Sequence, residues 1–171
     1  MLKVKLPFLL CCTLFVTSPQ AQIIINYTPN NTPDSRYTLH EDGTVTDTWT
    51  GLMWQRCSLG QSWNGGACNG TVSAYNWQQA LQQSNSNNLA GYSDWRLPSI
   101  RELQSIVAYD RYGMAINGYI FPNMTSHFYW SSSPYDYRYI NRVWTIDFSN
   151  GEDPDYHRNW NNAVRLVRGA Q

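Results

Sequence analysis

The chain has 171 residues, of which 42% are hydrophobic and 15% aromatic, with 12 Lys+Arg against 12 Asp+Glu. Both lysines lie within the first five residues, so the rest holds 10 Arg and 12 acidic residues, a formal charge of 10 − 12 = −2. We therefore expect no nucleic-acid partner, because the chain offers no general attraction for a polyanion or an anionic membrane.

The first 21 residues are typical of a secretory signal peptide. A short basic region precedes an apolar run over residues 6–16, and small residues follow up to Ala21. A bilayer span needs about 20 apolar residues, so no membrane span is expected in the mature chain. An alternative makes Cys11 or Cys12 a lipoprotein cysteine, but the apolar run continues beyond them. The sequence thus predicts export to the periplasm, the cell surface or the medium.

The mature chain is expected to form one domain behind a short lead-in. Residues 22–35 are polar and rich in Pro and Asn after an apolar start, which indicates a linker or an edge strand. Residues 36–171 are sufficient for a single domain with a hydrophobic core. The chain contains no internal repeat and no collagen-like stalk.

Three short strands are predicted at the start of this domain. Residues 36–40 and 44–47 flank Asp42-Gly43, and this dipeptide supplies the positive-φ positions that a tight β-hairpin turn needs. A turn at Thr50-Gly51 precedes a third strand over residues 52–55. These elements indicate an antiparallel sheet.

Two cysteines remain after the signal peptide, Cys57 and Cys68. Export makes a disulfide between them the leading interpretation. A metal site is the alternative, but the pair has neither the Cys-x-x-Cys spacing nor a nearby histidine. The chain-entropy model gives a bridge of this loop length a value of roughly 3 kcal/mol.

Two helices follow the cysteine pair. Asn76 with Gln79 and Ser99 with Glu102 each have the spacing of a capping box, in which the N-cap side chain and the third helical residue satisfy each other's backbone amides. The expected inward positions of the first helix are Trp77, Ala80, Leu81 and Ser84, and those of the second are Ile100, Leu103, Ile106 and Val107.

The C-terminal third returns to strands. They are predicted over residues 128–131, 142–148 and 163–168, with Trp144, Ile146 and Phe148 on one face of the second and Val164 and Leu166 inward in the third. Strands, then two helices, then strands is the pattern of an α+β domain.

Several motifs between Arg36 and Arg168 occur together in a fixed order. They are Asp42-Gly43-Thr44-Val45-Thr46-Asp47, Thr50-Gly51-Leu52-Met53-Trp54, Trp77-Gln78-Gln79-Ala80-Leu81, Gly91-Tyr92-Ser93-Asp94-Trp95-Arg96-Leu97-Pro98-Ser99, Glu102-Leu103, Tyr129-Trp130-Ser131-Ser132 and Val164-Arg165-Leu166-Val167-Arg168. This series resembles the Lcl C-terminal domain family of bacterial exported proteins. The loop with the cysteine pair is similar to that of a family subgroup.

The resemblance implies a C-type-lectin-like fold, also similar to sulfatase-modifying factors, with two helices, a small mostly antiparallel sheet and long loops. The namesake of the family is a collagen-like surface adhesin whose terminal domain binds sulfated polysaccharide. This chain lacks the collagen stalk and carries a slightly negative charge, and both departures weaken the transfer of polyanion binding.

Aromatic residues divide into two groups. Those within the motifs or on predicted inward faces are interpreted as core, namely Trp54, Trp77, Trp95, Trp130 and Trp144. A second group lies outside the motifs and the apolar periodicity, and it is our candidate ligand-binding set: Tyr135, Tyr137, Arg138, Tyr139, Tyr156, Arg158 and Trp160. Such rings beside Arg, Asn and Asp suit a sugar or a partner protein. The alternative is that these loops pack their own side chains.

The expected function is that of an exported, adhesin-like, non-catalytic module that binds a glycan or a surface protein. The alternatives are an assembly partner in a cell-envelope complex and an enzyme of unknown type, although no nucleophile-elbow motif or readable histidine partner is present. No cofactor is expected. Residues 152–155 and 160–162 are similar to the calcium motifs of true C-type lectins, but the second piece lacks its acid and a charged turn is favoured.

Overall fold

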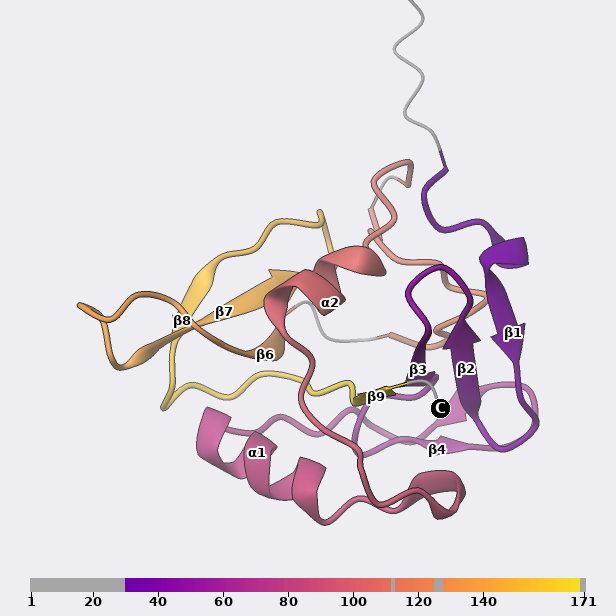
Figure 1. The fold of residues 1–171 in the computed structure, drawn as a ribbon, viewed down its shortest axis with the longest axis horizontal. Helices are drawn as coiled ribbons and strands as arrows, with labels where there is room; N and C mark the ends of the chain where they lie inside the picture. Colours follow the sequence, from indigo (N-terminus) through magenta and orange to yellow (C-terminus); the bar gives the residue numbers. More distant parts are fainter. Residues whose placement is uncertain (1–29, 112, 125–127, 170–171) are drawn as a thin grey trace, which may run out of the picture.

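The structure is a computed structural model that describes residues 30–111, 113–124 and 128–169. The expected signal peptide and the apolar start of the lead-in lie outside the described residues. The elements in chain order are β1 Tyr37–Leu39, β2 Thr44–Asp47, β3 Leu52–Gln55, β4 Ser62–Trp63, β5 Cys68–Asn69, α1 Trp77–Asn85, α2 Ile100–Ser105, β6 Phe128–Pro134, β7 Arg142–Asp147, β8 Asp155–His157 and β9 Val167–Gly169 (Figure 1). Two helices with small antiparallel sheets confirm the predicted α+β class.

A four-stranded antiparallel sheet has the order β1-β2-β3-β9. Its first turn is the predicted Asp-Gly hairpin: Asp42 Oδ1 accepts from the Thr44 amide at 2.9 Å, and Gly43 has a φ of 83°. The third strand also has its predicted bounds. This sheet therefore follows directly from local sequence signals.

The last strand is shorter than predicted. The expected strand covered residues 163–168, whereas β9 begins at Val167. The carbonyls of Val164 and Leu166 accept hydrogen bonds from the amides of Leu59 and Gln55, respectively. This segment is therefore held by isolated hydrogen bonds instead of the regular ladder of a strand. Val164 and Leu166 are nevertheless fully buried, as expected.

Both helices begin as predicted. Asn76 accepts from the Gln79 amide and Ser99 from the Glu102 amide, and each partner side chain returns a bond to the cap, so both capping boxes are present. The second helix ends at Ser105, before the last two residues of its expected apolar stripe, which are still fully buried. Neither α1 nor α2 has the length and hydropathy to cross a bilayer, and nor has any other helix in the described ranges.

A three-stranded antiparallel sheet, β6-β7-β8, lies at the opposite side of Figure 1 from β1 and β2. The prediction that one face of β7 points inward is incomplete, because both faces are covered. Val143 and Thr145 are fully buried on one face, and Ile146 is fully buried on the other. Trp144, expected to be core, is only half-buried. The sheet therefore offers no free face for a ligand except near its ends.

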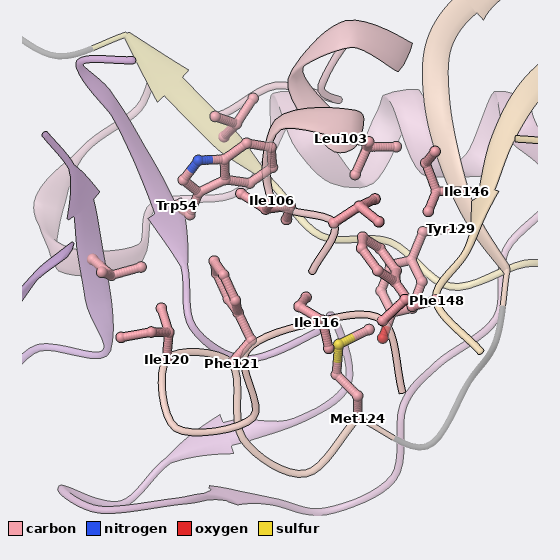
Figure 2. Packing of buried hydrophobic residues seen from close by; sticks show 14 of the residues in the cluster. Trp54, Leu103, Ile106, Ile116, Ile120, Phe121, Met124, Tyr129, Ile146 and Phe148 are labelled. Carbon is pink, nitrogen blue, oxygen red and sulfur yellow. The ribbon is translucent and has the colours of Figure 1, made fainter. Parts of the chain in front are cut away.

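Two hydrophobic clusters cover the two faces of that sheet. The larger joins Trp54 of β3, Leu103 of α2, Tyr129 of β6 and Ile146 of β7 (Figure 2). The smaller joins Ala80 of α1 to the opposite face; its other buried members are Trp95, Leu97, Trp130, Val143, Val164 and Leu166. Three of the five tryptophans predicted as core, Trp54, Trp95 and Trp130, are thus buried, whereas Trp77 and Trp144 are half-buried.

The end of the lead-in packs against the domain. Thr32 is fully buried, and its carbonyl accepts a hydrogen bond from the Asn117 side chain at 2.8 Å. Asn31 donates to the carbonyl of Val107 at 2.6 Å. Residues 31 and 32 therefore contribute to the folded unit.

Cys57 and Cys68 form the predicted disulfide. The bridge closes a loop that contains the short hairpin β4-β5, and it ties that loop to the end of β3. Neither cysteine belongs to the two hydrophobic clusters. The disulfide thus organises a local region and leaves the core to other residues.

We expect no free thiol when the oxidised mature chain is denatured and titrated with a thiol reagent. Replacing Cys57 and Cys68 together by Ser should lower the free energy of unfolding by roughly 3 kcal/mol, because the unfolded chain regains loop entropy. The doubly substituted domain should still fold, because both clusters remain intact. Two titratable thiols per mature chain would overturn the assignment.

Candidate functional site

Residues 135–141 connect β6 to β7, and we call them the tyrosine loop. The loop has defined backbone hydrogen bonds: Tyr139 donates to the Asp136 carbonyl at 2.9 Å, and Arg142 donates to the Tyr139 carbonyl at 2.8 Å. Asp136 also accepts from the backbone amide of Arg138 at 2.8 Å. The loop is therefore ordered before any ligand arrives.

The tip of this loop presents large side chains to solvent. Tyr137 is 87% exposed, Ile140 69% and Tyr139 53%. Beside them, the Arg138 guanidinium pairs with Asp136 at 2.9 Å, and the hydrogen bond from Arg138 lowers the pKa of that carboxyl. The exposed apolar surface of the tip is thus flanked by a neutralised charge pair.

A hollow of about 250 Å³ lies at the base of the tyrosine loop, between Tyr135, Tyr139, Arg142 and Asp155. The Tyr135 ring centroid lies 5.8 Å from that of Tyr139 and 4.7 Å from that of Trp144. Arg142 donates to Asp155 across the β7-β8 pair, and this hydrogen bond raises the pKa of Arg142. Aromatic rings and an ion pair therefore line one small concave surface.

The second predicted segment packs mainly on its own neighbours. Tyr156 lies between Phe128, at a centroid distance of 4.6 Å, and Trp160, at 5.1 Å. The Arg158 guanidinium carbon stands 4.3 Å from the centroid of the Trp77 ring. Trp160 is 59% exposed, whereas Tyr156 and Arg158 are half-buried. This half of the candidate set is therefore closer to the alternative of loops that pack their own side chains.

The structure does not bring the two segments onto one face of the sheet. Tyr156 stands opposite Val143, and Asp155 stands opposite Trp144 in the β7-β8 register. Successive side chains of a strand point to opposite faces. Tyr135, which packs on Trp144, and Asp155 thus lie on one face, and Tyr156 with its neighbour Trp160 lies on the other.

Residues 43–168 match the family model of the Lcl C-terminal domain. The chain belongs to the Lcl C-terminal domain family. This match confirms the resemblance found in the sequence motifs and covers every strand from β2 to β8, both helices and the tyrosine loop. Among curated proteins, none matches the chain.

Two carboxylates of residues 152–155, the segment similar to a calcium motif, are bound by other side chains of this Lcl C-terminal domain. Asp153 accepts from the Gln104 side chain at 2.7 Å, and Asp155 pairs with Arg142. Within the described ranges, no three His, Cys, Asp or Glu side chains gather where they could hold a metal ion. This segment therefore acts in the structure as a set of contacts between α2 and the three-stranded sheet.

A second hollow was not anticipated from the sequence. It has a volume of about 520 Å³ and lies between the β1-β2 turn, the disulfide loop and the segment after α1. Its lining includes Glu41, Asp42, Gln55, Trp63 and Asn87. The one available signal was Trp63, an aromatic residue in a Gly-, Ser- and Asn-rich loop outside every apolar period.

Proposed function

We propose that this Lcl C-terminal domain is an exported, non-catalytic binding module that recognises a glycan, or else a surface protein, through the tyrosine loop. The observation that carries the proposal is the exposure of Tyr137 and Tyr139 at the tip of a loop whose backbone is internally hydrogen-bonded. Rigid aromatic side chains lose little conformational entropy on binding, so they are effective anchors for sugars and proteins.

The charges of the loop favour an uncharged ligand. Arg138 is paired with Asp136, and Arg142 is paired with Asp155. A sulfated polysaccharide would have to displace a carboxylate from each guanidinium before it gained an anion contact. We therefore expect a neutral glycan and an affinity that changes little between low and high salt.

Two wider features belong to the same proposal. The α+β architecture with two helices, small antiparallel sheets and long connections is compatible with a C-type-lectin-like fold. The disulfide is compatible with an oxidising compartment, namely the periplasm, the cell surface or the medium. Export would bring the tyrosine loop into contact with envelope or host ligands.

A surface protein is the second candidate because of Ile140. This aliphatic side chain is 69% exposed beside the tyrosines, and it adds apolar area that a sugar ring does not require. Such a contact would also suit an assembly partner within a cell-envelope complex. A pull-down from envelope extract therefore complements any screen of glycans.

Tyr137→Ala should weaken binding by about tenfold or more, because loss of an aromatic anchor at the centre of a contact costs about 2 kcal/mol. Folding should be unaffected, since the side chain is 87% exposed. Trp160→Ala is the matched control: it also removes an exposed ring, but from the other face of the sheet. Isothermal titration against the ligand found by the screen would measure both. Equal losses in the two variants, or none in Tyr137→Ala, would contradict the assignment.

A further inference from the structure

The 520 Å³ hollow beside the disulfide has the size of a ligand pocket, because small-molecule sites in proteins usually enclose about 300–1,000 Å³. It shares no lining residue with the hollow at the tyrosine loop. Binding of a ligand in this hollow would therefore be independent of binding at the tyrosine loop.

The walls of this hollow are held in place before a ligand binds. Trp63 donates through Nε1 to the Glu41 carbonyl at 2.9 Å, and the Arg56 guanidinium carbon lies 4.1 Å from the Trp63 ring centroid. A Cβ at Gly43 would approach the Trp63 side chain to 2.7 Å, so only glycine permits this close contact. The Cys57–Cys68 bridge fixes the rest of the loop.

The polar atoms of the hollow offer both donors and acceptors. Gln55, which is 4% exposed, donates through Nε2 to Asn87 Oδ1 at 2.7 Å, so its Oε1 is left to accept and Asn87 Nδ2 is left to donate. Asp42 uses Oδ1 for its turn, and its Oδ2 has no partner among the described residues. Sugar hydroxyl groups, which both donate and accept, match this mixture.

The cations near the hollow are occupied elsewhere. Arg56 donates to the carbonyls of Ile120 and Tyr119, and it is covered by the Trp63 ring. Arg165, fully buried beneath Ser58, donates to the carbonyls of Gln55 and Arg56. Among the residues that the structure describes, no basic side chain lines the hollow, so an anionic ligand would meet two carboxylates there and no free cation.

The same two guanidinium groups oppose an organic cation. Arg56 lies behind the Trp63 ring and Arg165 behind Ser58, so a cation in the hollow would be repelled by two guanidinium groups as well as attracted by the carboxylates at the rim. An uncharged ligand is repelled neither by the carboxylates nor by the guanidinium groups. The indole of Trp63 and the side chains of Leu59 and Leu89 supply the apolar surface against which the C–H face of a sugar ring packs.

We infer that this hollow is a second binding site, for one uncharged sugar unit, formed by the β1-β2 turn, the disulfide loop and Asn87. Its carboxylate and amide oxygens accept hydroxyl protons, Asn87 donates one bond, and Trp63 packs on the ring. The unit is either a free sugar or the end of a neutral glycan chain.

The test is ligand-observed NMR on the purified, oxidised full chain with uncharged hexoses, N-acetylhexosamines, their short oligomers, and a sulfated sugar for comparison. We expect saturation transfer to an uncharged sugar at millimolar concentrations and none to the sulfated one. Equal affinity for a monosaccharide and its oligomer would indicate a free sugar, and tighter binding of the oligomer a chain end; either outcome supports the site.

Two substitutions locate that binding. In a chain that also carries Tyr137→Ala and Tyr139→Ala, so that the tyrosine loop does not contribute, Ser62→Trp should abolish it by filling the hollow, whereas Ser93→Trp, at an exposed serine elsewhere, should not. Glu41→Ala should weaken it by about tenfold, the value of one hydrogen bond to a charged group, with Glu152→Ala as the control. Tyr137→Ala and Tyr139→Ala by themselves should leave binding at this hollow in place, which separates this site from the tyrosine loop. Binding that survives Ser62→Trp in the chain without Tyr137 and Tyr139, preference for the sulfated sugar, or no binding of any uncharged sugar would overturn the inference.

Discussion

Asp47→Ala is expected to lower the free energy of unfolding by about 3–5 kcal/mol, because it leaves a buried guanidinium without its carboxylate. Arg36 and Asp47 are 4% and 0% exposed, and Arg36 donates to both carboxylate oxygens through Nε and Nη2. Asp47 also accepts from the Thr50 hydroxyl at 2.7 Å. Urea denaturation would measure the loss. Asp110→Ala, at an exposed aspartate, should stay within about 0.5 kcal/mol.

The same pair gives the stability a pH dependence. Burial alone would raise the pKa of Asp47, but the hydrogen bonds from Arg36 and Thr50 outweigh it, so the pKa is lowered. A lowered pKa in the folded state contributes stability above the ordinary aspartate pKa, and this contribution is lost as the pH falls through the folded-state value. Asp47→Ala should therefore cost less in acid than at neutral pH. A cost that is small at neutral pH, or that grows in acid, would contradict the role given to the pair.

Trp95→Ala is expected to cost about 3–5 kcal/mol, the usual range for removing a large buried ring. Trp95 is 2% exposed, contacts the Tyr92 ring edge-on at 6.4 Å and donates through Nε1 to the Leu89 carbonyl at 3.0 Å. Trp49→Ala is the control, because that ring is 64% exposed and packs on Arg36. It should cost about 0.5–1 kcal/mol, the value of an exposed cation–π contact.

Thermal and urea unfolding of both tryptophan variants would measure these two losses of stability. A Trp95→Ala domain of unchanged stability that no longer bound its ligand would move this residue from the core to the site. Circular dichroism of the same samples would check that the variants keep the secondary structure of the unaltered domain.

Local signals in the sequence were sufficient for the elements that are set by a few neighbouring residues. Asp42-Gly43 fixed the first hairpin, and the capping boxes at Asn76 and Ser99 fixed both helix starts. The disulfide followed from the isolated cysteine pair. Each of these depends on hydrogen bonds or covalent bonds within a short stretch of chain.

Features that depend on distant partners were not predictable. The segment 163–166 is buried like a strand, but its carbonyls pair with the disulfide loop, so the regular strand begins later at Val167. The separation of Tyr135 from Tyr156 depends on the register of β7 with β8, and a shift of one residue would reverse it. The second hollow needs Gln55 and Asn87, which are 32 residues apart in sequence, to meet.

The burial of arginine side chains was likewise not predictable from the sequence. Arg165 stands in an apolar run, and nothing in its neighbours indicates that its guanidinium is fully buried between the rings of Phe121 and Tyr129. Burial lowers its pKa, and the carbonyls of Gln55 and Arg56 take the place of a carboxylate partner. Only the three-dimensional arrangement supplies these acceptors.

The most direct test of the proposed function is a glycan array probed with the oxidised Ser62→Trp domain, in which the second hollow is filled, and, in parallel, with a double variant of that same domain that also carries Tyr137→Ala and Tyr139→Ala. We predict signals on uncharged glycans that persist at high salt and that the double variant loses while it unfolds at the same temperature as the Ser62→Trp domain. Signals confined to sulfated glycans and abolished by salt, or signals that the folded double variant retains, would contradict recognition of a neutral glycan by the tyrosine loop.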